Sequence, residues 1–311
     1  MKVVEFVSVR NEKHLVLIFG LGLIGTSILE RLKSSNLIST SNFSFSWNDF
    51  SLQNDNFKKI NSYLYKINEK YFIDVIWSAG VGGFFSTNEN METELNSYKN
   101  VLQFTHKLYN EKKNFTILFH LFSSAGGLFE GMSVINKFQK PYPLRPYSEI
   151  KLKQENLLIS ESYNFNYKIY RPSTVYGFYP NARQSLISTM ITKTIKNEFL
   201  EIFASKSSLR DYILVDDIAN FIKKIILSTA CETKKNNDIY FLASGKPTSI
   251  EEIIELISKT MNRNIFNSFN FNQKNSLNTT FSDKVIPVEL NISTLDFGIM
   301  KTHHRIINNL F

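Results

Sequence analysis

Cysteine is nearly absent from the 311-residue chain, in which Cys231 is the only one. A single thiol forms no intrachain disulfide and no multi-cysteine metal site, so a disulfide scaffold is excluded and a reducing compartment is favoured. Long apolar runs are also missing, since the longest, Leu15 to Ile24, has ten residues and includes two glycines. A membrane-spanning helix needs about 20, and the N-terminus lacks the apolar stretch of a secretory signal. We therefore predict a cytoplasmic protein with no integral membrane segment.

No block of basic residues accounts for the formal net charge of +8, which arises from 36 Lys and Arg against 28 Asp and Glu. The basic residues are scattered among acidic ones, as in Glu30-Arg31-Leu32-Lys33. A positive surface of this kind favours an anionic small molecule, and nucleic acid is not an expected partner. Hydrophobic residues make up 43% and charged residues 21% of the chain. These fractions are those of a globular protein and exclude a disordered or collagen-like chain.

Short apolar runs alternate with segments of helical periodicity in the first part of the chain. The predicted strands cover residues 15–19, 43–47, 74–80, 115–124 and 167–173, and the predicted helices cover residues 26–35, 54–72, 90–110 and 147–162. Strands that alternate with helices form a parallel sheet with helices on both faces. We therefore predict an α/β fold with a Rossmann-like, doubly wound parallel sheet.

The alternation of strands and helices becomes less regular after Gly177. Helices are expected over residues 183–198, 216–230 and 249–261, and strands over residues 238–244 and 284–291. We predict a dinucleotide-binding domain over residues 1–177, with residues 210–244 packing back onto it. Residues 178–209 and 245–311 are expected to form a smaller, mixed α/β substrate-binding region.

A glycine-rich turn directly follows the first predicted strand. Its sequence, Gly20-Leu21-Gly22-Leu23-Ile24-Gly25, is a G-x-G-x-x-G motif between a strand and a helix. The glycines allow a tight turn and the close approach of a pyrophosphate, which then faces the N–H groups and positive dipole of the helix N-terminus. The motif predicts a bound dinucleotide, and the alternative is a turn needed only to pack the helix on the strand.

The ribose of such a dinucleotide is commonly bound by an acidic residue about 20 residues after the motif. Here the second predicted strand ends at Trp47 and is followed by Asn48 and Asp49. Either side chain can accept a hydrogen bond from the ribose, and the alternative is a solvated loop. No arginine follows to bind a 2′-phosphate, so we expect NAD as the cofactor, with NADP possible.

Tyr147 and Lys151 lie four residues apart at the start of a predicted helix, so their side chains share one face. An ammonium group near a phenol favours the phenolate, which makes the pair an acid/base device for a hydroxyl or a carbonyl. The strand before this helix ends in Ser123-Ser124, at the edge of the sheet where open α/β sheets bind ligands. The hydroxyl of Ser124 can orient the same substrate oxygen, and the alternative for the serine pair is a strand-end turn.

Together these motifs resemble the extended short-chain dehydrogenase/reductase family, and more narrowly its NAD-dependent epimerase/dehydratase branch, which acts on nucleotide sugars. The resemblance rests on GLGLIG (20–25), WSAG (77–80), Asn96, SSAGG (123–127), YSEIK (147–151), RPSTVYG (171–177) and RDYILVDDIA (210–219). It implies that Ser124, Tyr147 and Lys151 form the catalytic triad, and that Ser124 and Tyr147 contact the substrate. The family is often dimeric through a four-helix interface, which here would be formed by residues 90–110 and 147–163.

The resemblance also implies how the cofactor and the substrate are bound. The cofactor phosphates would lie along Leu23 and Ile24, and Ala79 and Gly80 would pass close to the cofactor, with Asn96 nearby. With the residues named above, the expected cofactor-binding set is Gly20, Gly22, Leu23, Ile24, Gly25, Asn48, Asp49, Ala79, Gly80, Asn96, Tyr147 and Lys151. Arg210 would hold the diphosphate of a nucleotide sugar with its planar fork. The alternative for Arg210 is a surface pair with Asp211.

Departures from the family pattern reduce the number of reactions that we expect. Dehydratases of the family place an Asp-Glu pair where this chain has Ala125 and Gly126, so 4,6-dehydration is not expected. Cys231 falls in or after a late helix, which disfavours the double epimerisation that uses a Cys and a His. We therefore expect a 4-epimerase or a 4-keto reductase of a nucleotide sugar that supplies surface polysaccharide precursors. The alternative is a non-catalytic NAD(P) sensor.

Two further expectations concern the fold and the histidines. The family's third strand, with the acid that contacts adenine, is not recognisable in residues 50–72. His120 lies in an apolar strand and is interpreted as a core residue, and no histidine shows the spacing of a metal site.

Overall fold

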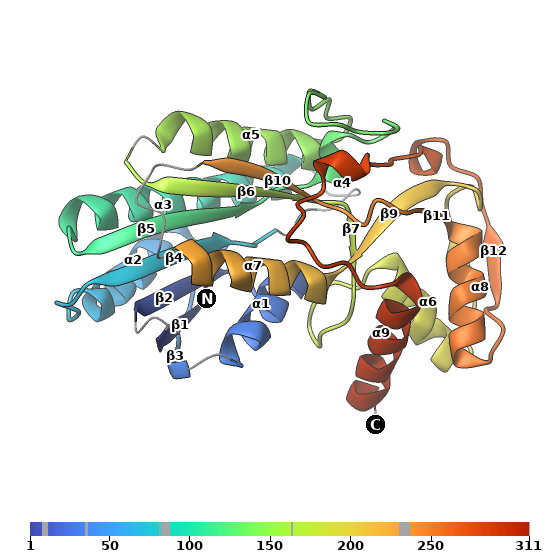
Figure 1. Ribbon diagram of the computed structural model, residues 1–311, viewed down its shortest axis with the longest axis horizontal. Coiled ribbons are helices and arrows are strands. Elements are labelled where there is room, and N and C mark those ends of the chain that lie inside the picture. Colours follow the sequence, from blue (N-terminus) through green and yellow to red (C-terminus); the bar gives the residue numbers. More distant parts are fainter. Residues whose placement is uncertain are drawn as a thin grey trace.

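The computed structural model describes residues 1–7, 12–34, 37–80, 82, 88–162, 164–229 and 237–310. A seven-stranded sheet lies between two layers of helices (Figure 1), and its strands run in the order β10-β6-β5-β4-β2-β1-β3. The strands are β1 (Lys2–Val7), β2 (Lys13–Phe19), β3 (Leu37–Asn42), β4 (Tyr71–Trp77), β5 (Phe115–Phe122), β6 (Asn166–Pro172) and β10 (Asp238–Leu242). The predicted α/β fold with a Rossmann-like, doubly wound sheet is confirmed.

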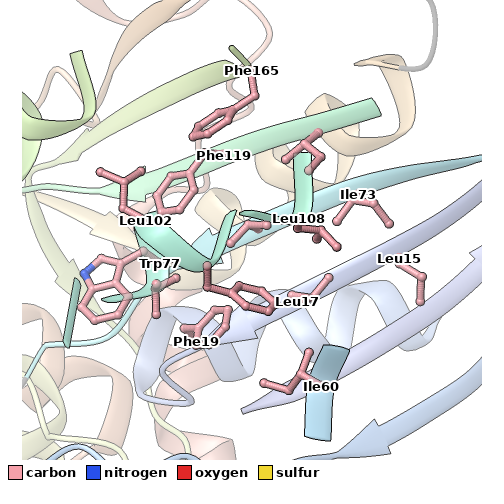
Figure 2. Packing of buried hydrophobic residues seen from close by; sticks show 14 of the residues in the cluster. Leu15, Leu17, Phe19, Ile60, Ile73, Trp77, Leu102, Leu108, Phe119 and Phe165 are labelled. Atoms are coloured by element: carbon pink, nitrogen blue, oxygen red, sulfur yellow. The ribbon is translucent and has the colours of Figure 1, made fainter. Parts of the chain in front are cut away.

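Helices cover both faces of this sheet. One face carries α1 (Leu23–Lys33) and α7 (Val215–Thr229), and the other carries α2 (Phe50–Leu64), α3 (Asn88–Glu111) and α5 (Pro146–Glu161) (Figure 1). Successive side chains of a strand point to opposite faces, so β2 serves both layers. Its residues Leu15, Leu17 and Phe19 pack with Ile60 of α2 and with α3 (Figure 2), while Val16 and Ile18 pack under α1 and α7.

The β3 edge of the sheet differs from the prediction. Strand β1 inserts between β2 and β3 and pairs antiparallel with both, although no strand was predicted there. The strand predicted over residues 43–47 is wrong, because β3 ends at Asn42. Phe43, Phe45 and Trp47 alternate because they pack into the hydrophobic cluster under α2 and α3. Helix α2 ends at Leu64 and β4 begins at Tyr71, so no further strand forms between them.

The C-terminal part forms a smaller layer beside the sheet (Figure 1). It consists of β7 (Thr174–Tyr176), α6 (Leu186–Ile195), β8 (Leu200–Ile202), β9 (Leu209–Leu214), β11 (Pro247–Ser249), α8 (Ile250–Met261), β12 (Asn267–Phe269) and α9 (Leu295–Leu310). Helices α6, α8 and α9 share a hydrophobic core of their own, to which Ile191, Ile253 and Ile306 belong. The strand expected over residues 284–291 does not form. Instead, the short 3₁₀ helix η2 (Asp283–Val285) covers its start, and another, η1 (Lys274–Ser276), lies before it in the chain. The domain boundary at residue 177 stays a prediction.

An acidic residue at the start of α7 joins the two parts of the chain. Asp216 is 1% exposed and forms ion pairs with Arg31 of α1 at 2.6 Å, and with Lys301 and Arg305 of α9 at 2.9 and 2.7 Å. Burial alone would raise the pKa of Asp216, but the hydrogen bonds and charges of Arg305 and Lys301 hold it below its ordinary value. The carboxylate is therefore a charged link between α1, α7 and α9.

We expect Asp216→Asn to lower the free energy of unfolding at pH 7 by about 2–3 kcal/mol, because three cations that remain partly solvated lose their counter-charge. The lowered folded-state pKa means that this stability is present above the unfolded pKa, near 4, and is lost as the pH falls through the folded value. Urea unfolding at pH 7 and pH 3 measures both effects. The difference in free energy of unfolding between wild type and variant should be smaller at pH 3 than at pH 7. An equal difference at both pH values would contradict the assignment.

Candidate active site

The glycine turn joins β2 to α1, and its three glycines have different surroundings. Gly20 has a φ of +99°, and a Cβ atom there would overlap the main-chain N of Ala79. A Cβ atom on Gly25 would overlap the carbonyl oxygen of Gly20. At Gly22, by contrast, no atom lies within 4 Å of the Cβ position. Gly20 and Gly25 are therefore required by backbone packing, and Gly22 leaves space in front of the helix.

A cavity of about 340 Å³ begins at this turn. Its lining residues are Gly20, Leu21, Gly22, Trp47, Asn48, Trp77, Ser78, Ala79, Gly80, Thr93, Glu94 and Ser97. No side chain caps α1 at Gly22, so the N–H groups of the first turn can bind an anion. The indole N–H of Trp77 is buried and finds no hydrogen-bond partner among the described residues. The open backbone at the start of α1 fits the pyrophosphate of a dinucleotide.

The predicted ribose-binding residues separate in the structure. Asn48 lines the cavity. Asp49 is exposed, and its carboxylate accepts the N–H of Leu52 at 3.0 Å, so that it caps α2. The two residues therefore have different environments, and only Asn48 belongs to the cavity wall.

The remaining predicted cofactor residues also divide into two groups. Ala79 and Gly80 follow β4 and line the cavity, whereas Leu23 and Ile24 lie in the first turn of α1 and are not part of its lining. Asn96 is exposed on α3 and does not line the cavity. Sequence reasoning missed Thr93, Glu94 and Ser97, which supply the wall of the cavity from the same helix.

Ser124 and Tyr147, two of the predicted catalytic residues, lie against the same glycine. Ser124 follows β5, and its Oγ accepts the N–H of Gly127 at 3.1 Å, which caps the short helix α4 (Ala125–Leu128). Tyr147 lies in the first turn of α5 and is half-buried. A Cβ atom on Gly127 would stand 3.2 Å from Cε1 of Tyr147 and 3.3 Å from Oγ of Ser124. The phenol ring and the hydroxyl are therefore neighbours at the carboxyl end of β5.

Lys151, the third predicted catalytic residue, is buried one turn further along α5. Its Nζ lies 5.8 Å from the centre of the Tyr147 ring and donates to Glu94 Oε1 at 2.9 Å and to Gln154 Oε1 at 3.2 Å. Burial alone would lower the pKa of Lys151, but the charges of Glu94 and Tyr147 and the hydrogen bond to Glu94 raise it above its ordinary value. A Cβ atom on Gly80 would stand 3.7 Å from Nζ, so the ammonium lies just behind the cavity wall.

Arg210, the predicted substrate residue, lies in β9 and is half-buried. Its Nη2 donates to the main-chain oxygen of Asn275 at 3.0 Å. The neighbouring Asp211 is buried and accepts hydrogen bonds from Ser173 and Gly245 at 2.6 and 2.7 Å. These bonds make Asp211 an anchor between β9 and the ends of β6 and β10.

The interpretation of His120 as a core residue is confirmed. Its Nε2 is 2.8 Å from Asp74 Oδ1 and its Nδ1 is 2.9 Å from the hydroxyl of Tyr170, and all three side chains are buried. Within the described ranges, no group of three His, Cys, Asp or Glu side chains could hold a metal ion, and no helix is long and apolar enough to cross a membrane. Cys231 lies outside the described residues.

A glycine turn, a cavity beside it and a Tyr–Lys pair thus lie at one edge of a doubly wound sheet. The sequence matches the profile of the NAD dependent epimerase/dehydratase family over residues 16–243. The chain therefore belongs to this family, which confirms the resemblance, and NAD is the cofactor of the family.

Individual relatives agree with this assignment. A putative UDP-glucose 4-epimerase of Methanocaldococcus jannaschii is 28% identical over 144 residues, which are 44% of this chain and 45% of the relative. The match thus spans less than half the length of that protein. UDP-glucose 4-epimerases from Thermus thermophilus, in complex with NAD, and from Thermotoga maritima, with UDP-glucose, have TM-scores of 0.74 and 0.73. Both are 16% identical, and the alignments cover 94% and 95% of this chain and 98% and 99% of theirs, so they establish the shared fold.

Proposed function

We propose that this chain is an NAD-dependent 4-epimerase of a nucleotide-activated sugar. The proposal is carried by one observation: Ser124, Tyr147 and Lys151 lie together at the sheet edge, with Lys151 behind the wall of a cavity that fits a dinucleotide. A sugar hydroxyl beside Ser124 and Tyr147 would meet a proton acceptor next to the cavity in which NAD would be held. The partial match to a UDP-glucose 4-epimerase supports chemistry at C4 and a UDP-sugar as substrate.

The chain's own residues move and hold a proton in this reaction. Bound NAD supplies the acceptor, and later the donor, of a hydride at the sugar carbon. Tyr147, as phenolate, takes the proton of the C4 hydroxyl when that carbon is oxidised, and returns it to the same oxygen when the carbon is reduced from its other face. Ser124 retains its O–H proton as a donor to that oxygen. Lys151 favours the phenolate through its charge.

We assign the diphosphate of the nucleotide sugar to Arg210, whose guanidinium can form two parallel hydrogen bonds to a phosphate. The residues expected to form the substrate region, 178–209 and 245–311, include the segment around Asn275 that Arg210 contacts.

We infer in addition that the product serves the assembly of surface polysaccharides. Loss of such polymers after deletion of the gene would support that role.

The proposed reaction is tested by incubating the purified protein with UDP-glucose, UDP-galactose, UDP-N-acetylglucosamine and UDP-glucuronic acid, followed by chromatography of the sugars. Conversion of one C4 epimer into the other without net formation of NADH supports the epimerase. Consumption of NADH or NADPH with a 4-keto sugar identifies a reductase instead. Mass spectrometry of small molecules released from the protein adds a second readout, because copurified NAD is expected of an epimerase. Conversion of none of these sugars would contradict the proposal.

Gly127 offers a test of how closely Ser124 and Tyr147 must be placed. In Gly127→Ala, the new Cβ would stand 3.2–3.3 Å from both side chains, so they must move by a few tenths of an ångström. We expect the turnover number to fall about tenfold, since a misplacement of 1 Å can cost about 100-fold. Gly126→Ala is the matched control, because no atom lies within 4 Å of its Cβ position. Equal activities of the two variants would contradict the placement.

A homodimer through α3 and α5 is part of the proposal. The exposed residues of these helices are mostly polar: Glu89, Glu92, Asn96, Lys99, Gln103, Lys107, Asn110 and Glu111 on α3, and Glu149, Lys153, Asn156, Ile159 and Ser160 on α5. A dimer across these faces would therefore depend on polar contacts and weaken at high salt. Light scattering at low and high salt tests this expectation, and a monomer at both would contradict it.

A further inference from the structure

We propose that Glu94 is a positioning residue of the tyrosine–lysine pair, whose carboxylate holds the Lys151 ammonium in place behind the cavity wall and balances its charge. The inference rests on the proposed function where activity is measured, and on dinucleotide binding alone where it is not.

The contacts of Glu94 bring helices α3 and α5 together. Its side chain is 2% exposed, and that of Lys151 is 4% exposed. Oε1 accepts hydrogen bonds from Lys151 Nζ at 2.9 Å and from Gln154 Nε2 at 3.0 Å, and Oε2 accepts the N–H of Gly82 at 3.3 Å. Both oxygens are thus bonded, and the carboxylate has one well-defined position beside the ammonium.

The position of the ion pair connects it to ligand binding. Glu94 lines the cavity, and a Cβ atom on Gly80 would stand 3.6 Å from its Oε2 and 3.7 Å from Nζ of Lys151. Burying an ion pair costs desolvation, and well-packed apolar side chains of similar volume are often equally stable. A buried pair at the wall of a cofactor cavity, one helical turn from Tyr147, is therefore better explained by function than by stability.

The other charged groups around Lys151 do not replace Glu94. Glu155 of α5 is also close enough to act on Lys151, but its carboxylate is held by Arg171 of β6 through two hydrogen bonds of 2.9 and 2.6 Å. Within the described part of the chain, Tyr147 is the remaining titratable group whose charge acts on that of Lys151. Removing the charge of Glu94 takes away the largest of the charges that offset burial, so the pKa of Lys151 falls, and the ammonium beside Tyr147 loses the carboxylate that is bonded to it. Both effects shift the pH range in which the protein is active to lower pH.

Four variants separate charge from shape. Glu94→Gln removes the charge, and Glu94→Asp keeps it but shortens the reach. The double variant Glu94→Gln with Gln154→Glu moves the carboxylate to the oxygen that already lies 3.2 Å from Nζ. Glu92→Gln is the control, because it removes an exposed carboxylate from the same helix.

The pH profile of sugar conversion is the first readout. Glu94→Gln should shift the profile to lower pH by about one unit, as expected for loss of a charge within about 4–6 Å. The double variant should return it to within a few tenths of a unit of wild type, and Glu92→Gln should leave it unchanged. Glu94→Asp should keep the wild-type profile while the turnover number falls about tenfold. A Glu94→Gln profile like that of Glu92→Gln overturns the inference.

Binding of NAD is the second readout and needs no sugar chemistry. The chain has two tryptophans, Trp47 and Trp77, and both line the cavity, so their fluorescence reports NAD binding. Wild type should bind NAD with a constant Kd from pH 7 to about 9.5, since its ammonium stays charged. Glu94→Gln should bind NAD about fivefold or more weakly towards the upper end of this pH range. The double variant should bind NAD as tightly as wild type there.

The two readouts distinguish the possible failures. If wild type binds NAD and the variants show the expected pH dependence of binding, but no sugar is converted, the proposed function fails and the role of Glu94 stands. If sugars are converted but Glu94→Gln behaves like wild type in both readouts, the role of Glu94 fails alone. If Glu94→Gln loses the circular dichroism spectrum of the folded protein, the double variant and Glu94→Asp are measured in its place. A folded double variant whose pH profile and NAD binding differ from those of wild type would then overturn the inference.

Discussion

Tyr147→Phe is expected to lower the turnover number by about 10²–10⁴-fold, the usual contribution of a general acid/base. A phenyl ring can neither take the proton from the sugar hydroxyl nor return it. The ring itself has room to stay, because its edge lies against Gly127 and Gly82, where Cβ atoms would stand 3.2 and 3.1 Å from it. The affinity for NAD, measured by tryptophan fluorescence, should therefore stay within severalfold of wild type.

Tyr142→Phe is the matched control for this prediction. Tyr142 lies in the loop before α5, and 64% of it is exposed, so removing its hydroxyl should leave turnover unchanged. Conversion of a UDP-sugar should be followed for both variants at saturating substrate, so that a change in turnover is separated from a change in binding. Activity of Tyr147→Phe close to that of Tyr142→Phe would show that another group moves the proton.

Features that depend on neighbouring residues were predictable from the sequence. The run of Leu15–Phe19 followed by the glycines sets a buried strand and a tight turn, and the four-residue spacing of Tyr147 and Lys151 places both on one helix face. That no third strand is recognisable in residues 50–72 also follows from local sequence, because the polar, helical pattern there forms α2 (Phe50–Leu64). These local signals fix the site's main components.

Features that depend on distant partners were not predictable. Residues 2–7 form a strand because β2 and β3 lie on either side of it, and no local pattern specifies that arrangement. Asn96 and Glu94 differ by two positions, which on a helix is a rotation of about 200°, so one is exposed and the other buried. An acidic residue within the buried stripe of Met91, Tyr98 and Val101 was the available signal for Glu94.

The position of Asp49 shows the same limit on a smaller scale. An acid at the expected distance from the glycine turn suits a ribose, but the same residue type is preferred at the start of a helix. The N–H groups of α2 compete for its carboxylate, and the bond to Leu52 fixes Asp49 as the cap. The role of Asp49 is decided by where the helix begins: the helix predicted over residues 54–72 begins at Phe50 and ends at Leu64 in the structure.

Lys151→Met is expected to shift the pH profile of conversion to higher pH by about 1–2 units, because the ammonium that favours the phenolate of Tyr147 is lost. The substitution also leaves the buried carboxylate of Glu94 without its cation, with Gln154 and Gly82 as its remaining donors. We expect NAD to bind about tenfold more weakly, since this uncompensated negative charge lies at the wall of the cavity.

Lys153→Met is the matched control, since it removes an exposed ammonium from the same helix. Profiles of kcat/KM from pH 6 to 10, with NAD titrations by tryptophan fluorescence, should show a shift and a loss of affinity for Lys151→Met alone. A second comparison tests the cause: adding Glu94→Gln to Lys151→Met removes the unpaired carboxylate and should restore part of the affinity for NAD, because the ammonium is still missing, while the profile stays at higher pH. If affinity does not recover, the carboxylate is not what weakens binding. If Lys151→Met keeps the wild-type profile, the electrostatic link between Lys151 and Tyr147 is contradicted, because the ammonium that lies 5.8 Å from the centre of that ring has been removed.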